Sequence, residues 1–444
     1  MDVREVLSSQ KNERDAMLAN SYINRENLGS LKAALRHDLI KVIVGPRRAG
    51  KSVFAIEALK GQDFVYLNFD DERLLKVTDY DEILKGIPQV YGSTKTLFFD
   101  EIQNLQKWEL FLSRLHRSGY NIVITGSNSK LLGRELSTHL TGRFHRFDIY
   151  PFSFKEFLRA KGYGSTEDFE ATKAQQGQSL ALLLEYLQKG GYPEVVVKGV
   201  DLGYLKTLYD SIILRDIVER YRVRAVDDLK NVGGQLITSY SSPVSMNSLK
   251  KALNMKSTTT VEKFVGYLSE AFLTFTVDRF SYKAKERAKS RKKVYVYDTG
   301  MIDAVSSEFS RNIGRKIENA VAIELARQRH DGIFYYKTAD NKEVDFVVKD
   351  GIRVSELIQV CYDIDSPKAK AREVGALVKA ASEIKCDKNT LITWDKQDDI
   401  LDHGVNINVV SLRQWLTGWV AGQGREEKET DSWDPANPGL PSPG

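Results

Sequence analysis

The stretch GPRRAGKS at residues 45–52 decides the fold of this 444-residue chain. It has the spacing G-x-x-x-x-G-K-[ST] of a P-loop, the phosphate-binding turn between a strand and a helix. The apolar run at residues 39–44 predicts a buried strand before the turn, and residues 53–59 have helical spacing after it. The pattern therefore predicts a nucleoside-triphosphate site at this turn.

The chemistry of a P-loop assigns a role to each part of the stretch. Backbone N–H groups wrap the phosphates at the positive end of the helix. Lys51 is expected to reach the β- and γ-phosphates, and the Ser52 hydroxyl to bind magnesium. The expected ligands are ATP and Mg2+, although no motif selects adenine over guanine. The expected cofactor-binding residues are Gly45, Pro46, Arg47, Arg48, Ala49, Gly50, Lys51, Ser52 and Val53.

A second acidic motif follows about 50 residues later, in the sequence TLFFDE at residues 96–101. Its apolar residues predict a buried strand that delivers Asp100 to the carboxyl edge of a sheet, where α/β proteins bind ligands. Asp100 is the expected second magnesium ligand, acting through water. Glu101 is the expected general base for the attacking water. Without the P-loop, such a pair would more often be a helix N-cap.

Three further candidate catalytic residues are predicted beyond these motifs. The strand-like run at residues 121–125 is followed by Ser127 and Asn128, which are candidates to sense the γ-phosphate; a simple turn or N-cap is the alternative. Arg143, in the turn LTGR, is either an arginine finger given to a neighbouring subunit or a structural salt-bridge partner. The first interpretation predicts a homo-oligomer.

Composition limits the remaining function classes. The chain has 65 basic and 60 acidic residues, a net charge of only +5, so nucleic-acid binding would depend on local patches. Its two cysteines make neither a disulfide framework nor a zinc site alone, which favours a reducing, cytoplasmic location. The start of the chain lacks a signal-peptide core, and no run of about 18 apolar residues predicts a membrane span.

The pattern of strands and helices predicts an α/β protein built from several units. Alternating strands and helices indicate a parallel sheet around the P-loop. Later, three compact helices precede two strands with a basic loop between them, the order of a winged helix. The predicted units are an N-terminal helix (1–20), a P-loop domain (21–160), a helical lid or linker (161–225), a winged-helix-like unit (226–305), an α/β unit (306–421) and a disordered tail (422–444).

A series of motifs also indicates a family. In chain order they are INR (23–25), the Arg-Arg of the P-loop, FDEIQ (99–103), Trp108, TGS (125–127), GR (142–143), YPFSFKEF (150–157), GGYPE (190–194), RDI (215–217) and YDTG (297–300). Over roughly residues 20–360 the chain resembles archaeal and bacterial AAA-class ATPases that carry a domain of unknown function behind the ATPase module. The resemblance implies an AAA-like core, a winged-helix module and a nuclease-like C-terminal domain. It implies no particular biological role.

The basic loop of the winged-helix-like unit is a candidate site for double-stranded DNA. A positive loop between two strands would track phosphates, and the alternative is a solvated charged loop or a module that packs against protein. The loop holds one acidic residue and seven basic ones: Lys283, Lys285, Arg287, Lys289, Arg291, Lys292 and Lys293.

The C-terminal unit resembles the PD-(D/E)xK nuclease core but departs from it at the decisive positions. Glu318 on a helix and Asp345 on a strand match the two acids. The E-x-K positions hold Gln359 and Cys361, which are a poor magnesium ligand and an uncharged side chain. Glu356 is at odd strand spacing from Gln359 and is expected on the other face. We therefore expect a nuclease-like fold with doubtful catalysis.

Three functions are compatible with these observations. The first is an AAA-class ATPase that couples hydrolysis to DNA binding or remodelling. The second is a nucleotide-gated signalling switch whose C-terminal units bind protein. The third is an ATP-controlled nuclease.

Overall fold

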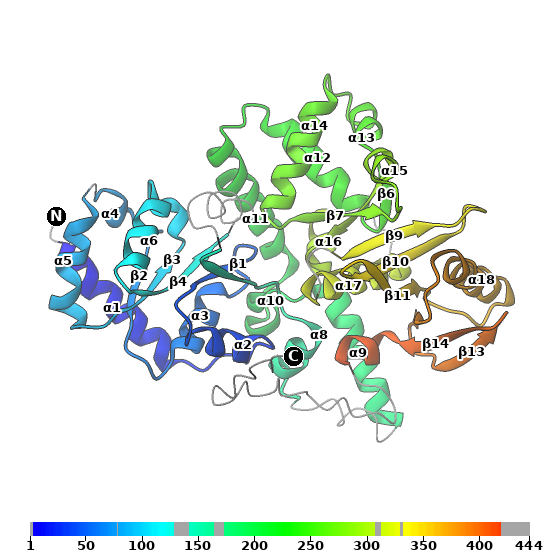
Figure 1. Cartoon of the computed structure of the whole chain (residues 1–444), viewed down its shortest axis with the longest axis horizontal. Coiled ribbons are helices and arrows are strands. Elements are labelled where there is room, and N and C mark those ends of the chain that lie inside the picture. Colours follow the sequence, from blue (N-terminus) through cyan, green and yellow to red (C-terminus); the bar gives the residue numbers. More distant parts are fainter. Residues whose placement is uncertain are drawn as a thin grey trace, which may run out of the picture.

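The structure is a computed structural model that describes residues 3–77, 79–127, 142–163, 173–306, 312–328 and 332–418. Figure 1 shows a sheet with its helices near the N-terminus, a second and larger sheet at the other end of the molecule, and a group of helices beside the junction. The predicted tail and Asn128 lie outside the described residues.

The N-terminal sheet is parallel and contains five strands in the order β2-β3-β4-β1-β5. Four of these strands match the apolar runs of the sequence. The fifth, with the sequence FHRFD, was not predicted because its first three residues are half-buried or exposed. The bounds are β1 Ile40–Val44, β2 Val65–Asn68, β3 Thr96–Asp100, β4 Asn121–Gly126 and β5 Phe144–Asp148.

Helices cover both faces of this sheet, so its central strands are buried throughout. On β1, Val42 and Val44 pack into one core with Trp108, whereas Ile43 packs into the opposite core with Phe54. This is the alternation that a strand requires. The surrounding helices are α1 Val3–Ala19, α2 Leu28–Ala34, α3 Lys51–Leu59, α4 Glu72–Leu75, α5 Tyr80–Tyr91 and α6 Trp108–Arg117, with a 3-10 turn at Ile102–Asn104.

A helical region follows and contacts the P-loop side of the sheet. Its elements are α8 Phe154–Ala160, α9 Lys173–Lys189, α10 Pro193–Lys198, α11 Leu202–Ser211, a π-helical segment Ile212–Glu219, α12 Val226–Thr238, α13 Met246–Ala252 and α14 Thr258–Glu270. The three predicted compact helices are present as α12, α13 and α14. They pack around an apolar cluster that includes Leu236, Leu249 and Leu268.

The larger sheet has nine strands in the order β13-β14-β12-β11-β10-β9-β7-β8-β6. Strand β7 pairs in parallel with β9, with Asp278 opposite Phe334, so the segments on either side of residue 305 share one sheet. Figure 1 shows this continuity from β6 and β7 to β13 and β14. The strands are β6 Ser242–Val244, β7 Thr274–Arg279, β8 Lys292–Val296, β9 Ile333–Lys337, β10 Glu343–Asp350, β11 Arg353–Val360, β12 Asn389–Thr393, β13 Asp398–Asp402 and β14 Val405–Ser411.

Helices complete this half of the molecule. The expected basic loop between β7 and β8 contains a short helix, α15. The others cover the sheet or connect its strands. The bounds are α15 Ala284–Lys289, α16 Thr299–Val305, α17 Ile313–Gln328, α18 Pro367–Ile384 and α19 Leu412–Thr417. Among the described residues, none of the helices combines the length and apolar character that a bilayer crossing requires.

Candidate functional site

The P-loop turn runs from the end of β1 to the start of α3, and its two glycines are required by geometry. A Cβ at Gly45 would lie 1.9 Å from the carbonyl oxygen of Ile149. Gly50 has a φ of +91°, a left-handed conformation that side chains other than glycine rarely adopt. The loop therefore turns tightly, and its backbone N–H groups lie at the N-terminus of α3.

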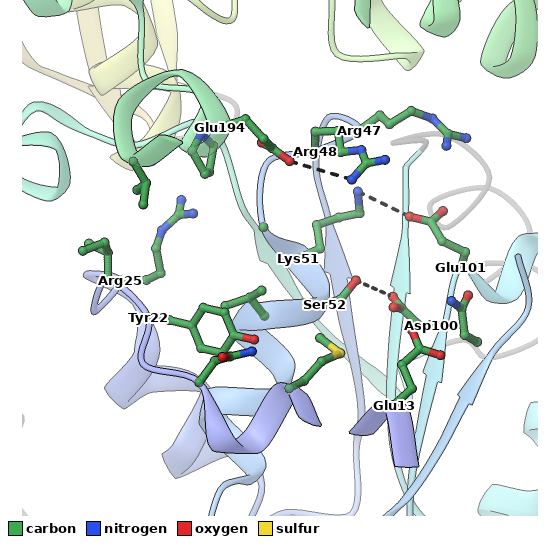
Figure 2. A pocket seen from close by; sticks show the side chains of 18 of the residues that line it. Glu13, Tyr22, Arg25, Arg47, Arg48, Lys51, Ser52, Asp100, Glu101 and Glu194 are labelled. Atoms are coloured by element: carbon green, nitrogen blue, oxygen red, sulfur yellow. Dashed lines mark hydrogen bonds and ion pairs between the residues drawn. The ribbon is translucent and has the colours of Figure 1, made fainter. Parts of the chain in front are cut away.

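The predicted phosphate and metal residues converge at the carboxyl edge of the sheet. The Ser52 hydroxyl donates to Asp100 Oδ1 at 2.9 Å, and Lys51 Nζ lies 3.5 Å from Glu101 Oε1 (Figure 2). Lys51 also donates to the carbonyl oxygen of Pro46 at 3.1 Å. In this state, the cation that is expected to bind phosphate is held by a carboxylate and a backbone carbonyl.

Thr125 connects the two acids of this site. Its hydroxyl donates to Asp100, and its oxygen accepts the backbone N–H of Glu101 at 3.0 Å. Burial, together with the neighbouring Glu101 carboxylate, raises the pKa of Asp100 to about 6. A divalent cation between Ser52 and Asp100 would remove this repulsion, and hydroxyl and carboxylate oxygens are suitable ligands for it.

Glu101 is held differently from Asp100. Burial alone would raise its pKa, but the Lys51 ammonium, the Gln103 amide and the Arg47 guanidinium together outweigh burial and lower the pKa below its ordinary value. Gln103 also donates to Glu101 Oε2 at 2.5 Å. Glu101 itself adopts a left-handed backbone conformation with φ +50°. The carboxylate is therefore ionised and positioned, as a general base must be.

These residues line a cavity of about 620 Å³ that extends away from the P-loop. Another part of its wall comes from α1, from the segment after α1 and from α10, and Figure 2 shows Tyr22 and Glu194 on this part. The P-loop side holds the predicted phosphate-binding groups. The wall is formed by Glu13, Met17, Asn20, Ser21, Tyr22, Ile23, Pro193, Glu194, Val197 and Lys198.

Three arginines around the P-loop make contacts that the sequence did not predict. Arg25 is buried and donates to Glu156 at 2.9 Å, to the Ala49 carbonyl at 2.9 Å and to the Tyr150 carbonyl at 2.6 Å. Arg47 pairs with Asp216 of the π-helical segment, and Arg48 lies 3.8 Å from Glu194. The motifs INR and RDI were the only signals for Arg25 and Asp216, because their partners are distant in the sequence.

The remaining predicted catalytic residues are only partly brought to this site. Ser127 is buried at the end of β4, and its Oγ has no hydrogen-bond partner within the described part of the chain. Arg143 is exposed and directly precedes β5, where its carbonyl accepts the Ile40 N–H at 2.9 Å. Ile40 begins β1, and the P-loop follows the end of β1. Arg143 therefore lies at the amino end of the parallel strands, whereas its own P-loop lies at their carboxyl end.

The glycine and aspartate motifs form a junction between domains. The Gly191 N–H donates to Asp298 Oδ2 at 2.7 Å, and the Phe152 N–H donates to the Gly191 carbonyl at 2.7 Å. A Cβ at Gly190 would lie 2.2 Å from Asp298. The motifs YPFSFKEF, GGYPE and YDTG therefore meet at one point and pack against one another.

The basic segment at residues 283–293 differs from the prediction at one residue. Lys293 was expected to contact DNA phosphate, but its side chain is 2% exposed and lies among carboxylates, so it is excluded as a phosphate contact. The error arises because strand alternation turns Lys293 inward, whereas Lys292 is exposed and pairs with Asp278 at 2.9 Å. Lys283, Lys285, Lys289 and Arg291 are also exposed, and Arg287 is half-buried.

The nuclease-like positions come together in the second half of the chain, although not in a metal-binding form. Glu318 and Asp345 both contact Lys293, at 3.0 and 2.9 Å. Gln359 is buried and donates to Glu373 at 2.6 Å, and Cys361 is half-buried beside it. Glu356 pairs elsewhere, with Lys388 at 2.9 Å. Within the described residues, no group of three or more His, Cys, Asp or Glu side chains is arranged to hold a metal ion.

Comparison with known proteins gives two matches to family models. An AAA domain matches residues 37–158, which include the P-loop, Asp100, Glu101 and Arg143. A domain of unknown function matches residues 180–312. The α/β fold around the P-loop agrees with the first of these matches.

Full-length relatives are known from an archaeon and a bacterium. The chain is 38% identical over 392 residues to an uncharacterised protein of Methanocaldococcus jannaschii, covering 84% of this chain and 86% of the relative. It is 31% identical over 366 residues to an uncharacterised protein of Haemophilus influenzae, covering 78% and 88%. Among solved structures, a Walker-type ATPase of Pyrococcus abyssi is similar at 14% identity and a TM-score of 0.43, covering 64% of this chain and 96% of that one.

Proposed function

We propose that this chain, which belongs to one family with these archaeal and bacterial relatives and has an AAA-type P-loop ATPase fold, binds ATP with Mg2+ and hydrolyses it. The observation that carries the proposal is the placement of Lys51, Ser52, Asp100 and Glu101 at one edge of the sheet. Each of these residues has the chemistry that phosphoryl transfer to water requires.

The contacts support a sequence of events in which Lys51 changes partners. Without nucleotide, Lys51 is held by Glu101 and the Pro46 carbonyl. The more highly charged β- and γ-phosphates would attract the ammonium away from Glu101. Glu101 would then be free to accept a proton from the attacking water. The pairing thus keeps the base occupied until triphosphate binds.

Ser52 and Asp100 are the proposed ligands of Mg2+, which would neutralise phosphate charge when bound. Ser127 is proposed to orient the attacking water, because its buried hydroxyl has no partner among the described residues. Asn128 remains a second candidate for this role. Arg143 is proposed to act on the nucleotide of a neighbouring subunit, since it lies at the sheet edge opposite its own P-loop.

The experiment that tests the ATPase proposal compares phosphate release from ATP by the wild type and by Lys51→Ala. Loss of the ammonium should lower turnover by at least about 100-fold, the effect of removing one group that stabilises transition-state charge. Lys60→Ala is the matched control, because Lys60 is exposed at the other end of the same helix and pairs with Glu57 at 3.6 Å. Equal rates for all three proteins would refute the proposal.

A coupled role on double-stranded DNA is the second candidate, and the exposed basic residues of the segment 283–292 favour it. Replacing Lys285, Lys289 and Arg291 by Ala should flatten the slope of log K against log salt by roughly 3 units, if each contacts one phosphate. The control replaces three exposed lysines on the P-loop domain, Lys32, Lys60 and Lys95.

The same binding experiment separates the remaining alternatives. An unchanged slope in the triple variant would remove this DNA site. Absence of DNA binding by the wild type would favour the signalling switch with protein partners. Nicking of the DNA in the presence of Mg2+ would favour the ATP-controlled nuclease.

A further inference from the structure

A cluster of three carboxylates surrounds one ammonium group in the second half of the molecule. Lys293 Nζ on β8 lies 3.0 Å from Glu318 Oε1, 2.8 Å from Glu343 Oε1 and 2.9 Å from Asp345 Oδ1. Glu318 comes from α17, whereas Glu343 and Asp345 are two residues apart on β10 and so share one face of the strand. The ammonium donates hydrogen bonds to Glu318 and Asp345 and forms an ion pair with Glu343.

We propose that Lys293 is the built-in cation of this cluster and excludes a divalent metal from it. In a nuclease-like site of this kind, the helix acid and the strand acid would hold the metal. Here those two acids are Glu318 and Asp345, and the ammonium lies against both. The proposal concerns a site separate from the P-loop and does not depend on ATP hydrolysis.

Hydrogen bonds to neighbouring residues also hold two of these carboxylates in place. Glu318 Oε1 accepts the Tyr295 hydroxyl at 2.8 Å, and Asp345 Oδ2 accepts the Val360 N–H at 3.0 Å. Gln359, at a position where the nuclease pattern has an acid, uses its oxygen to accept the Asp345 N–H at 3.1 Å. A metal would have to displace the lysine and break these bonds, and it would gain few free oxygens in return.

The lysine is charged in this environment. Burial alone would lower its pKa, but Asp345 and the other two acids outweigh burial and hold the pKa of Lys293 well above its ordinary value. Its ammonium also lies 5.9 Å from the centroid of the Tyr335 ring on β9. The surrounding acids therefore favour the charged form of Lys293.

The cluster joins two segments of the chain. The lysine belongs to the segment before residue 306, whereas its three partners follow residue 312. The pairing therefore locks the β7–β8 hairpin to α17 and β10. A neighbouring cavity of about 760 Å³ is lined by the same acids, together with Arg315, Lys342 and Arg372. Lys293 is not among the residues that line this cavity, and its ammonium offsets part of the negative charge of the acidic wall.

The test measures binding of Mn2+ to the nucleotide-free, full-length protein by electron paramagnetic resonance. The wild type should show no site that depends on the cluster, so Asp345→Asn should leave its Mn2+ binding unchanged. Lys293→Met should bind one additional Mn2+ at the cluster. Its affinity for Mn2+ there should exceed that of the wild type by roughly tenfold or more, because a competing cation has been removed from beside three carboxylates. The double variant Lys293→Met with Asp345→Asn should lose that gain.

Lys292→Met is the matched control, since Lys292 is the adjacent residue on β8, faces outward and pairs with Asp278. It should bind Mn2+ as the wild type does. Mn2+ should also raise the Tm of Lys293→Met more than that of the wild type, because only the variant has a metal site at this cluster in the folded state.

Two results would overturn the proposal. One is wild-type Mn2+ binding that Asp345→Asn abolishes, which can be measured even if Lys293→Met fails to fold. The other is a folded Lys293→Met protein that gains no Mn2+ site. The first result would show that the metal and lysine coexist, and the second that the acids cannot hold a metal even when freed.

Discussion

The guanidinium of Arg47 donates two hydrogen bonds to the carboxylate of Asp216, at 3.1 and 3.0 Å, across 169 residues of chain. Arg47 belongs to the P-loop, and Asp216 lies in the π-helical segment Ile212–Glu219. The side chain of Asp216 is 4% exposed. The pair therefore connects the phosphate-binding turn directly to this π-helical segment, which packs against α12 and α14.

Replacing Arg47 by Ala should destabilise the protein by roughly 3 kcal/mol, because it leaves the buried Asp216 carboxylate without its cation. The free energy of unfolding in urea measures this change. Arg48→Ala is the control: Arg48 is 64% exposed and lies 3.8 Å from Glu194, so its loss should cost less than about 1 kcal/mol. Equal destabilisation by both variants would contradict a special role for the Arg47–Asp216 pair.

Glu101→Gln should bind ATP with Mg2+ but turn it over roughly 10²- to 10⁴-fold more slowly, because only the proton acceptor is lost. Binding is measured with a fluorescent ATP analogue and turnover by phosphate release. Asp100→Asn serves as the contrasting variant, since it should weaken the magnesium-dependent part of binding. Hydrolysis at the wild-type rate by Glu101→Gln would place the base at another residue.

Arg143→Ala should lower turnover by about 10³-fold or more without lowering ATP affinity, as expected for a finger that stabilises the transition state in a neighbouring subunit. Mixing this variant with Lys51→Ala should restore part of the activity, because each mixed interface then has one intact site. Sedimentation of the wild type at working concentrations gives the independent check. A protein that is monomeric and fully active would exclude the role in trans.

Asp298→Asn should lower the free energy of unfolding, and the difference from the wild type should grow as the pH falls. Asp298 accepts N–H groups from Gly191 at 2.7 Å and Met301 at 3.0 Å, and an amide would leave one of them unpaired, a cost of about 1–3 kcal/mol. Burial raises the pKa of Asp298 to about 6, so the folded state binds its proton more tightly than the unfolded state.

The direction of the pH effect follows from the tighter binding of the Asp298 proton in the folded state. The wild type carries the penalty of an ionised, buried Asp298 above pH 6 and loses it as the pH falls towards 4, whereas the amide does not titrate. The difference in unfolding free energy between the two proteins should therefore widen from pH 7 to pH 4.5. A difference that stays constant with pH would mean that Asp298 is not strained in its ionised form.

The sequence by itself determined the strand, turn and helix around the P-loop, because the glycine spacing and the flanking apolar run are local properties. It likewise determined that Asp100 and Glu101 would follow a buried strand, since four apolar or β-branched residues precede them. The parallel strands then bring both motifs to one edge of the sheet.

Tertiary structure alone decided the contacts between residues far apart in the chain. Strand β5 has no apolar run, and only pairing with β1 makes it a strand. The charge of Lys293 suggested a contact with DNA phosphate, yet alternation along β8 turns it toward acids that lie 25 and 52 residues away. A lysine's sequence neighbours do not reveal its ionic partners, because those partners are set by which strands pair and which face each side chain takes.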